Sequence, residues 1–456
     1  MDFFDVVVIG GGSAGYAAAR TAESSGAKVA IVDKGPLGGL CILRGCMPTK
    51  AILRSSDILA LMHRAKEFGL FASNLSADLA LIHDRKTRLV NEFASYRIEQ
   101  LQDPKFSLIE EHASFLSPHD LNVGGGRVLS AKNFIIATGS TVAEFAVPGL
   151  SEAGFVTSDD VLELREAPES IIVLGAGPVA VELAQFFCRI GTKITLIQRS
   201  DHILSKGDED LARPVETRFR EEGMNLYTGT KLLRVEKSKH GRTVFFLHEG
   251  IKKSATASII LQALGRKPNI DRLNLAAASV KTNQGRIEVD QKMRTNVPHI
   301  FAVGDVNGLH EIVHIAIEQG EIAAHNATHE DARQFNQRLK VSVTFTDPPV
   351  ASVGLSEKEC QKLSILYLKA SYPFDDHGKS LCMGETHGHV KLLCSPDNGE
   401  IIGAHVVGPE AGEMIHQMVT LMYFRGTVHD LAQLPHYHPT LSEIFTYPAE
   451  ELTQKL

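Results

Sequence analysis

Two short runs of consecutive apolar residues are each followed at once by closely spaced glycines. The first run is Val6 to Ile9 and the second is Ile171 to Leu174. Apolar runs of this length, bounded by glycine, are typical of buried strands in parallel sheets, and the residues after each run read as a helix. We therefore predict two strand–turn–helix units, one at the start of the chain and one near its middle.

The remaining pattern predicts helices in the first third of the chain and a different kind of sheet near the end. Helical spacing is present at Ser55 to Phe68, Leu79 to Leu101, Glu410 to Phe424 and Val428 to Gln433, and strands are indicated at Val341 to Phe345, Val390 to Leu393 and Ile401 to Val407. These elements predict an α/β fold with two Rossmann-like dinucleotide-binding domains and a C-terminal α+β domain.

The first glycine-rich turn has the spacing of a dinucleotide fingerprint. In such a turn Gly10 permits the sharp bend, Gly12 lets the backbone approach a pyrophosphate, and Gly15 allows close packing of helix on strand. Asp33 closes the next apolar run, where a carboxylate can accept hydrogen bonds from a ribose. A glycine-rich turn in an unrelated fold is the alternative, and the strand before, the helix after and the acid at this distance favour a nucleotide site.

The second turn repeats the fingerprint as Gly175, Gly177 and Ala180, the last of which needs only a small side chain. The acid of the first unit is replaced here by Gln198, and Arg199 follows it. An amide and a guanidinium suit a ribose that carries a 2′-phosphate, so we predict NAD(P)(H) with a preference for NADPH. Gln198 can also bind an unphosphorylated ribose, and Arg199 can be a solvated surface charge.

Composition sets limits on the partners. The 456 residues predict three or four domains, and a net charge of -7 with no basic tract argues against nucleic acid. We expect no membrane span, and because the first strand begins almost at once we expect no export signal and a cytosolic protein.

Six cysteines are too few for a disulfide scaffold. Cys41 and Cys46 form a close pair just after the first fingerprint, and in a reducing compartment such a pair is more typical of a redox or metal site than of a structural disulfide. No second close ligand pair is present to complete a zinc site, so we predict no metal. We expect the other four cysteines to be small buried apolar residues.

Several further motifs carry a resemblance to a known family. They are Gly38 to Lys50, Ala137 to Gly139, Ala263 to Asn269, Thr295 to Asp305 and His436 to Glu443. Over essentially its whole length the chain resembles the FAD-dependent pyridine nucleotide-disulfide oxidoreductases, which include dihydrolipoamide dehydrogenase, glutathione reductase and mercuric reductase.

The resemblance implies a role for each matched residue. Cys46 would lie on the flavin side of a Cys41-Cys46 redox disulfide, and Cys41 would exchange with an external dithiol. Lys50 would pair with Glu182 beside the nicotinamide and the flavin. The other implied contacts are Thr138 and Gly139 at the end of the first nucleotide domain, Asp305 on the ribityl chain, Arg266 on the pyridine nucleotide, His438 as the catalytic base and Glu443 as its orienting partner.

The assignment of His438 also has a chemical reason. A thiol is a poor nucleophile until it loses its proton, and an imidazole titrates near neutral pH and can take that proton. A carboxylate on the other ring nitrogen fixes the tautomer and stabilises the imidazolium.

The resemblance and the breaks in the pattern predict four segments. Residues 1–146 would form the first part of the FAD-binding domain, 147–268 the NAD(P)-binding domain, 269–338 the second part of the FAD-binding domain and 339–456 the dimerisation domain. The resemblance further implies a homodimer in which His438 reaches the cysteine pair of the other subunit.

Within the family, the amino-acid sequence from His438 to Glu443 most resembles that of dihydrolipoamide dehydrogenase. This favours an enzyme that acts on a small dithiol or on a lipoyl-carrying protein. The last twelve residues contain no cysteine, which argues against mercuric reductase and the large thioredoxin reductases. Gln198 and Arg199 leave open an NADPH-dependent, glutathione reductase-like enzyme for a low-molecular-weight disulfide. A redox-inert flavin-binding sensor or structural subunit is the alternative from another class.

Overall fold

A computed structural model describes residues 2–456, which form two units, each assembled from separate parts of the chain. Unit 1 contains the chain up to Pro48 together with Asp84–Glu144 and Gly265–Asn336. Unit 2 contains Thr49–His83, Phe145–Leu264 and Gln337–Leu456. The four-segment division made from the sequence stays a prediction.

A mostly parallel sheet forms the centre of unit 1. Its parallel strands run in the order β3 (Phe106–Ile109), β2 (Val29–Val32), β1 (Asp2–Ile9), β6 (Val128–Ile136) and β18 (Ile300–Ala302). The hairpin of β4 (Ser114–Ser117) and β5 (Asp120–Asn122) pairs antiparallel with the start of β6. The apolar run of β1 is buried on both faces, which explains its continuous hydrophobicity.

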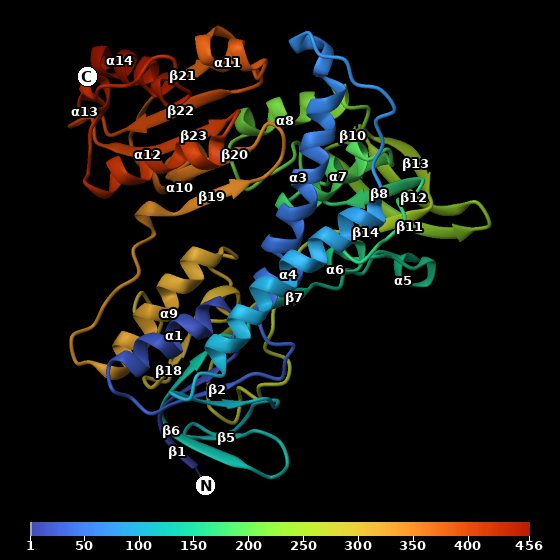
Figure 1. Ribbon diagram of the computed structural model, residues 1–456. Coiled ribbons are helices and arrows are strands. Elements are labelled where there is room, and N and C mark those ends of the chain that lie inside the picture. The colour runs from blue at the N-terminus through green and yellow to red at the C-terminus, as the bar shows by residue number, and fades with distance from the viewer. Residues whose placement is uncertain (1) are drawn as a thin grey trace. The chain divides into compact units, whose positions relative to one another are not determined.

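Two helices of unit 1, α1 (Ser13–Ser24) and α9 (Val313–Thr328), pack side by side (Figure 1). The contact face of α1 is built from alanines such as Ala14, Ala18 and Ala22, all buried. Small side chains allow the two backbones to approach closely, and a Cβ added at Gly320 of α9 would lie 2.3 Å from the carbonyl oxygen of Ala14. Two small ladders complete the unit: β7 (Ser140–Val142) with β15 (Arg266–Pro268), and β16 (Thr282–Asn283) with β17 (Arg286–Ile287).

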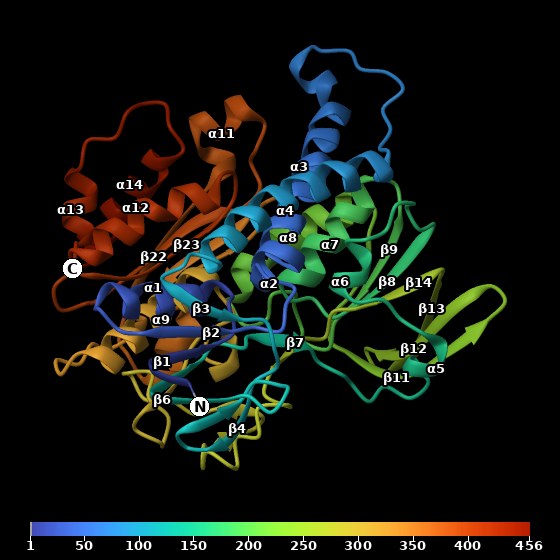
Figure 2. The same ribbon diagram turned by 60° about the horizontal axis from the view of Figure 1, so that its bottom comes forward.

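Unit 2 contains a second parallel sheet with the same order of its first three strands. It runs β10 (Asn225–Tyr227), β9 (Lys193–Ile197), β8 (Ser170–Leu174) and β14 (Ile259–Gln262). Helix α7 (Pro178–Arg189) follows β8, and α8 (Glu209–Glu221) precedes β10. An antiparallel sheet of β11 (Thr230–Ser238), β12 (Gly241–His248) and β13 (Ile251–Ala257) extends from this part (Figure 2).

The last part of unit 2 is an antiparallel sheet. Its order is β19 (Val341–Thr344), β20 (Val350–Gly354), β23 (Ile401–Val407), β22 (His389–Cys394) and β21 (Leu368–Pro373). Helix α12 (Ala411–Tyr423) packs on β20 and β23, and α14 (Thr446–Lys455) packs on β21 and against α13 (Val428–Gln433). The remaining α-helices within residues 2–456 are α2 (Gly39–Arg44), α3 (Cys46–His63), α4 (Leu79–Leu101), α5 (Leu150–Ala153), α6 (Ser158–Val161), α10 (Glu357–Leu363) and α11 (Gly378–Met383).

This architecture confirms the predicted fold class, and two expectations need correction. The helix predicted from Ser55 to Phe68 begins earlier, at Cys46, and ends at His63, with a separate 3₁₀ turn at Ala65–Phe68. Of the four single cysteines, Cys360 and Cys394 are buried as expected, whereas Cys188 is partly exposed and Cys382 is exposed. Cys382 lies near the end of the six-residue helix α11, which is too short to bury all of its sides.

No helix within residues 2–456 combines the length and the apolar character that crossing a membrane requires.

A buried ammonium group joins the C-terminal sheet to α8 and α10. Lys391 on β22 is 1 % exposed, and its Nζ lies 2.9 Å from Asp208, 2.8 Å from Asp210 and 3.0 Å from Glu357. Burial alone would lower the pKa of Lys391, but the carboxylates outweigh it and raise the pKa. The same contacts, working against burial, lower the pKa values of all three acids. These acids are the one group of three potential metal ligands found within residues 2–456, and Lys391 takes the position of a cation between them.

We predict that Lys391→Met lowers the free energy of unfolding by about 3–5 kcal/mol at pH 7, because three carboxylates lose their counter-charge in a buried place. The lowered pKa values stabilise the native protein above about pH 4, the ordinary value of these acids, and this stabilisation is lost as the pH falls further. Urea unfolding at several pH values should therefore show a deficit that persists down to about pH 4 and shrinks below it. Lys369→Met is the control: Lys369 pairs with Glu357 at 2.7 Å but is 56 % exposed, so we expect a loss of at most about 1 kcal/mol. Equal losses for both variants would contradict the prediction.

Candidate functional site

The first fingerprint forms a tight turn between β1 and α1. Gly10 has a φ of 105°, a conformation that favours glycine. A Cβ on Gly15 would lie 1.8 Å from the carbonyl oxygen of Gly10, so this position excludes any side chain. Gly12, in contrast, meets nothing nearer than Gly39, whose Cα lies 3.9 Å from the position of such a Cβ. The turn is therefore closely packed on its strand side and leaves room at Gly12.

Asp33 follows β2 and is bound to the same turn. Its carboxylate accepts hydrogen bonds from the amide of Gly11 at 2.6 Å and from the amide of Gly35 at 2.8 Å. Each carboxylate oxygen can accept a second hydrogen bond, so Asp33 keeps acceptor capacity for a ribose. The two amide contacts fix the acid beside the glycine turn.

The cysteine segment packs directly against this turn. A Cβ on Gly39 would lie 2.7 Å from the Cα of Gly12, so the backbone that begins α2 touches the fingerprint backbone. Cys41 lies on α2 and Cys46 is the first residue of α3, and both are partly exposed. The sequence reasoning assigned no role to Gly39, and the only signal for it is the glycine pair at residues 38 and 39.

A second group of predicted residues lies at the same, carboxyl end of unit 1's sheet, after the parallel strands β6 and β18. The hydroxyl of Thr138 donates to the carbonyl oxygen of Asn269 at 2.8 Å, and the amide of Asn269 donates to the carbonyl of Gly139 at 2.9 Å. The hydroxyl of Ser140 donates to Asp305 at 2.7 Å, and Arg266 donates to the hydroxyl and the carbonyl oxygen of Ser140 at 2.8 and 2.9 Å.

Arg266 is thus placed in unit 1 and joined through Ser140 to Asp305, the residue predicted to bind the ribityl chain. It lies in a different unit from the second fingerprint. The contact of Arg266 with a pyridine nucleotide stays a prediction.

These residues fit a flavin dinucleotide. The space beside Gly12 lets a ligand approach the backbone, and a side chain there would occupy part of that space. The amides at the start of α1 suit a pyrophosphate, and Asp33 suits a ribose.

The second fingerprint, in unit 2, has the same geometry with one difference. Gly175 has a φ of 99°, and nothing lies within 4 Å of the position of a Cβ at Gly177. Ala180 is 1 % exposed on α7 and carries its methyl group where the first unit admits none. Gln198 follows β9 and is anchored by its backbone: its amide donates to Tyr227 and its carbonyl accepts from Thr230.

The side chain of Arg199, next in the chain, is exposed, and within residues 2–456 no carboxylate forms an ion pair with it. Its guanidinium is therefore available to an anion at the carboxyl end of this sheet, where coenzymes bind in open parallel folds.

The predicted pair of Lys50 and Glu182 is present. Nζ of Lys50 lies 2.7 Å from Oε2 of Glu182, which is 4 % exposed, whereas Lys50 is 33 % exposed. The other oxygen of Glu182 accepts from the amide of Phe345 at 2.9 Å, and Nζ of Lys50 lies 4.5 Å from the ring of Phe345. Three parts of unit 2, namely α3, α7 and the loop after β19, meet at this pair.

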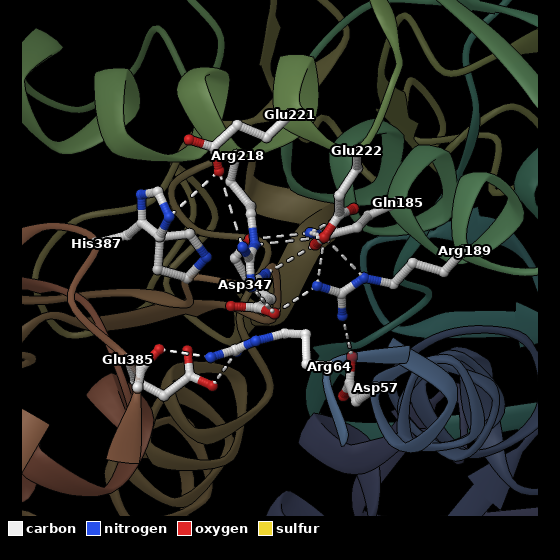
Figure 3. Close-up of polar contacts among 12 residues, drawn as sticks. Asp57, Arg64, Gln185, Arg189, Arg218, Glu221, Glu222, Asp347, Glu385 and His387 are labelled. Carbon is white, nitrogen blue, oxygen red and sulfur yellow. Dashed lines mark hydrogen bonds and ion pairs between the residues drawn. The ribbon is translucent and has the colours of Figure 1, made fainter. Parts of the chain in front are cut away.

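The same three parts meet again, with the charges reversed, seven residues further along each helix (Figure 3). Arg189 on α7 is 4 % exposed and contacts Asp57 of α3 at 2.8 Å, Glu222 at 2.6 Å and Asp347 of the loop. Between the two ion pairs, Gln185 exchanges two hydrogen bonds with the backbone of Asp347. The sequence reasoning did not identify this Arg189 cluster.

The carboxylates around Arg189 differ in their titration. Burial and the charge of Asp347 raise the pKa of Asp57 to about 6, although Arg189 opposes the rise. For Asp347 burial also acts to raise the pKa, but Arg189 and Arg218 outweigh it and lower the pKa. Asp57 is therefore the carboxylate of the cluster whose charged form the folded protein destabilises.

The predicted base and its partner lie together in the loop before α14. Nδ1 of His438 lies 3.1 Å from Oε2 of Glu443; the His438 side chain is 79 % exposed and that of Glu443 is 12 % exposed. Nε2 of a second histidine, His377, lies 3.4 Å from the other carboxylate oxygen. Nε2 of His436 lies 2.6 Å from the side-chain nitrogen of Gln417.

The fold and this set of residues define a class: an oxidoreductase with two dinucleotide sites, a cysteine pair on the first of them and a histidine–carboxylate pair. Comparison with known proteins agrees. Residues 4–320 match the family described as pyridine nucleotide-disulphide oxidoreductase, and residues 341–449 match the dimerisation domain of that family. The chain belongs to the FAD-dependent pyridine nucleotide-disulphide oxidoreductases, and the second match supports a homodimer.

Curated relatives from this family are similar over almost the whole chain. A mercuric reductase of Staphylococcus aureus is 35% identical over 430 residues, which cover 94% of this chain and 78% of the relative. A dihydrolipoyl dehydrogenase of Geobacillus stearothermophilus is 34% identical over 451 residues, which cover 98% of this chain and 95% of the relative. These identities do not separate the two activities.

Among solved structures, the HOCl-induced flavoprotein disulfide reductase RclA from Escherichia coli, in a Cu(II) complex, has a TM-score of 0.87 at 24% identity. The match covers 99% of this chain and 100% of that one, and it establishes the shared fold.

We predict that Asp57→Asn stabilises the protein at pH 8 by on the order of 1 kcal/mol. This value is well below what the pKa shift alone implies, because Asp57 is partly exposed and solvent screens its charge. Asp57 has a native pKa of about 6 against an ordinary value near 4, so the folded protein binds a proton before the unfolded chain does as the pH falls. Urea unfolding should therefore show that the advantage of Asp57→Asn disappears between pH 7 and pH 4.

The control for this prediction is Asp347→Asn. The lowered pKa of Asp347 means that its charge stabilises the native state, so this variant should be less stable than the wild type at pH 8. An Asp57→Asn protein less stable than the wild type at every pH would refute the account.

Proposed function

We propose that the protein is a dithiol/disulfide oxidoreductase of the dihydrolipoamide dehydrogenase type, with Cys41 and Cys46 as its redox pair. The observation that carries the proposal is the contact of Gly39 with Gly12, because it joins the cysteine segment to the turn of the first nucleotide site. A thiol pair in this position would lie close to a flavin bound at that turn. The substrate would be a small dithiol or a lipoyl-carrying protein.

The two cysteines have different environments that suit different roles. Cys46 begins the 18-residue helix α3, where the partial positive charge of the helix N-terminus favours a thiolate. Cys41 lies on the short helix α2 and is the sulfur that an external thiolate would attack. In the oxidised enzyme, that attack would break the Cys41–Cys46 disulfide, form a bond from substrate to Cys41 and release Cys46 as a thiolate. The second substrate thiolate would then displace Cys41, so that the substrate leaves as a disulfide and both cysteines are reduced.

His438 would hold the proton in these steps. Its ring is exposed and oriented by the nearly buried Glu443, so it can accept a proton from a substrate thiol at Nε2 while Nδ1 stays bound to the carboxylate. In the proposed homodimer this histidine serves the cysteine pair of the other subunit, so that each site is composed of two chains.

FAD, when bound, would accept the electron pair from the cysteines and exchange it with the pyridine nucleotide. Lys50 and Glu182 would contribute a positioned ammonium group, held by an almost buried carboxylate, beside the two rings. Running in the opposite direction, the same residues would reduce an external disulfide.

One observation favours a second candidate, an NADPH-dependent reductase of a low-molecular-weight disulfide. Arg199 is exposed and without an ion pair among residues 2–456, next to Gln198 where an acid would select NADH. We therefore propose NADPH as the preferred coenzyme, whether the substrate is a dithiol or a low-molecular-weight disulfide. A cytosolic location remains a prediction.

We predict that Cys46→Ser abolishes turnover and that His438→Ala slows it by on the order of a hundredfold, because the first removes the redox pair and the second removes the proton acceptor. The measurement is steady-state oxidation of dihydrolipoamide and reduction of lipoamide and glutathione disulfide by the purified holoenzyme. Cys382→Ser, at an exposed single cysteine, should keep full activity.

Near-normal turnover by Cys46→Ser would show that the chemistry is elsewhere. Dithionite titration separates the enzyme from the redox-inert alternative: an active pair takes up two electrons beyond those of the flavin, and an inert subunit does not.

We predict that Arg199→Ala raises the KM for NADPH by about tenfold and leaves the KM for NADH unchanged, because only NADPH carries the 2′-phosphate that the guanidinium can bind. Lys193→Ala, at the exposed opposite end of β9, is the matched control and should change neither value. Equal use of NADPH and NADH by the wild type, or an equal rise for both in Arg199→Ala, would refute the coenzyme assignment.

A further inference from the structure

Glu443 is held by two histidines, one on each carboxylate oxygen. Oε2 faces Nδ1 of His438 at 3.1 Å, and Oε1 faces Nε2 of His377 at 3.4 Å. The two histidines differ sharply in exposure, since the His438 side chain is 79 % exposed and that of His377 is 0 % exposed. Glu443 therefore connects an imidazole at the surface with one in the interior.

The contacts of His377 determine where its proton lies. Nδ1 of His377 is 2.8 Å from the hydroxyl of Ser380, which is fully buried at the start of α11. A carboxylate can only accept, so Nε2 must carry a proton if it binds Glu443, and Nδ1 of the neutral ring is then an acceptor for the Ser380 hydroxyl. In this form Nε2 presents its N–H toward Glu443 across 3.4 Å, a contact longer than a well-formed hydrogen bond, and has no other hydrogen-bond partner within residues 2–456.

The surroundings favour that neutral form. Burial lowers the pKa of His377, and His438 lowers it further, against the opposing charge of Glu443. Phe374 covers one side, with its ring centroid 6.4 Å from that of His377. A neutral His377 faces Glu443 with an N–H group and adds no positive charge, so the full negative charge of Glu443 remains available to His438.

We propose that His377 is a positioning residue for the acid–base chemistry: it fixes Glu443 through its second oxygen, and Glu443 in turn orients His438. The inference rests on the proposed function, because it concerns the same histidine–carboxylate pair. It extends the two-residue base to an ordered chain of His438, Glu443, His377 and Ser380 that runs from the surface to the interior.

The physical reason is the behaviour of a carboxylate held at one oxygen. With only His438 bound, Glu443 could rotate about its last bond and the exposed ring would follow, so the ring would spend less time in the orientation that accepts a proton. A second contact, from the buried Nε2 of His377 to the other carboxylate oxygen, limits this rotation. The effect belongs to kcat, since His377 is buried and cannot touch the substrate.

The first test compares His377→Leu with His377→Gln in the holoenzyme, with turnover of dihydrolipoamide or of lipoamide measured as above. Leucine fills the space without donating, and we expect kcat to fall by about tenfold with KM unchanged. Glutamine can donate to Glu443 and should restore most of the loss. A kcat unchanged in His377→Leu, or a glutamine variant as slow as the leucine variant, would overturn the proposal.

A double-mutant cycle separates positioning from a general loss of structure. In a Glu443→Gln background, His377→Leu should cause no further fall in kcat, because the interaction through which it acts is already lost. The matched control is His405→Gln. His405 is also buried in unit 2, contacts a serine hydroxyl at 2.9 Å and a carbonyl oxygen at 3.1 Å, and does not touch Glu443. Its effect should be the same in both backgrounds, and an equally additive effect of His377→Leu would overturn the proposal.

A third measurement does not depend on activity. The ¹⁵N spectrum of histidine-labelled protein, with the His377 signals assigned from the His377→Gln variant, should show a neutral ring protonated at Nε2 near pH 7. A proton on Nδ1, or an imidazolium, would overturn the inference. A wild type without dithiol turnover would instead refute the proposed function and leave this result to stand by itself.

Discussion

The ion pair of Lys50 and Glu182 is the interaction on which the arrangement of unit 2 depends. Glu182 is almost fully buried, and an unpaired carboxylate there would be costly, so α3 must lie where Lys50 can reach it. Seven residues along each helix, about two turns, Arg189 and Asp57 repeat the contact with opposite signs. A slip of one helix by two turns would bring like charges together. The two pairs thus fix the register of α3 against α7.

The strands and helices with a strong local pattern could be predicted from the sequence. Leu79 to Leu101 and Ile401 to Val407 have the predicted bounds, because unbroken helical spacing and an unbroken apolar run leave little alternative. The start of α3 was missed. Gly45 and Pro48 suggest a break, yet Pro48 falls in the first turn of the helix, where proline costs nothing because its missing amide would have no partner.

The residues of the candidate site also fall into two groups, those that could be predicted from the sequence and those that could not. Fingerprints, the cysteine pair and the stretch from His438 to Glu443 are each local in sequence, so their residue types and spacing identify them. His377 lies 66 residues before Glu443, and Arg189 meets residues from three separate segments. Nothing near these residues in the sequence marks them, since their importance comes from the tertiary contacts alone. Gly39 is intermediate: the glycine pair is visible, and its contact with Gly12 is not.

Ala180 of the second nucleotide site occupies the position that Gly15 occupies in the first site. The two sites therefore differ in which substitutions they can accept at this position. At the first site the helix touches the preceding carbonyl so closely that even one added carbon is excluded, and any descendant must keep that glycine. The second site already has a larger residue at this position, and Gln198 and Arg199, the side chains proposed to distinguish NADPH from NADH, follow β9. Under the proposed assignment, a change of coenzyme requires only substitutions after β9, whereas Gly15 admits no substitution.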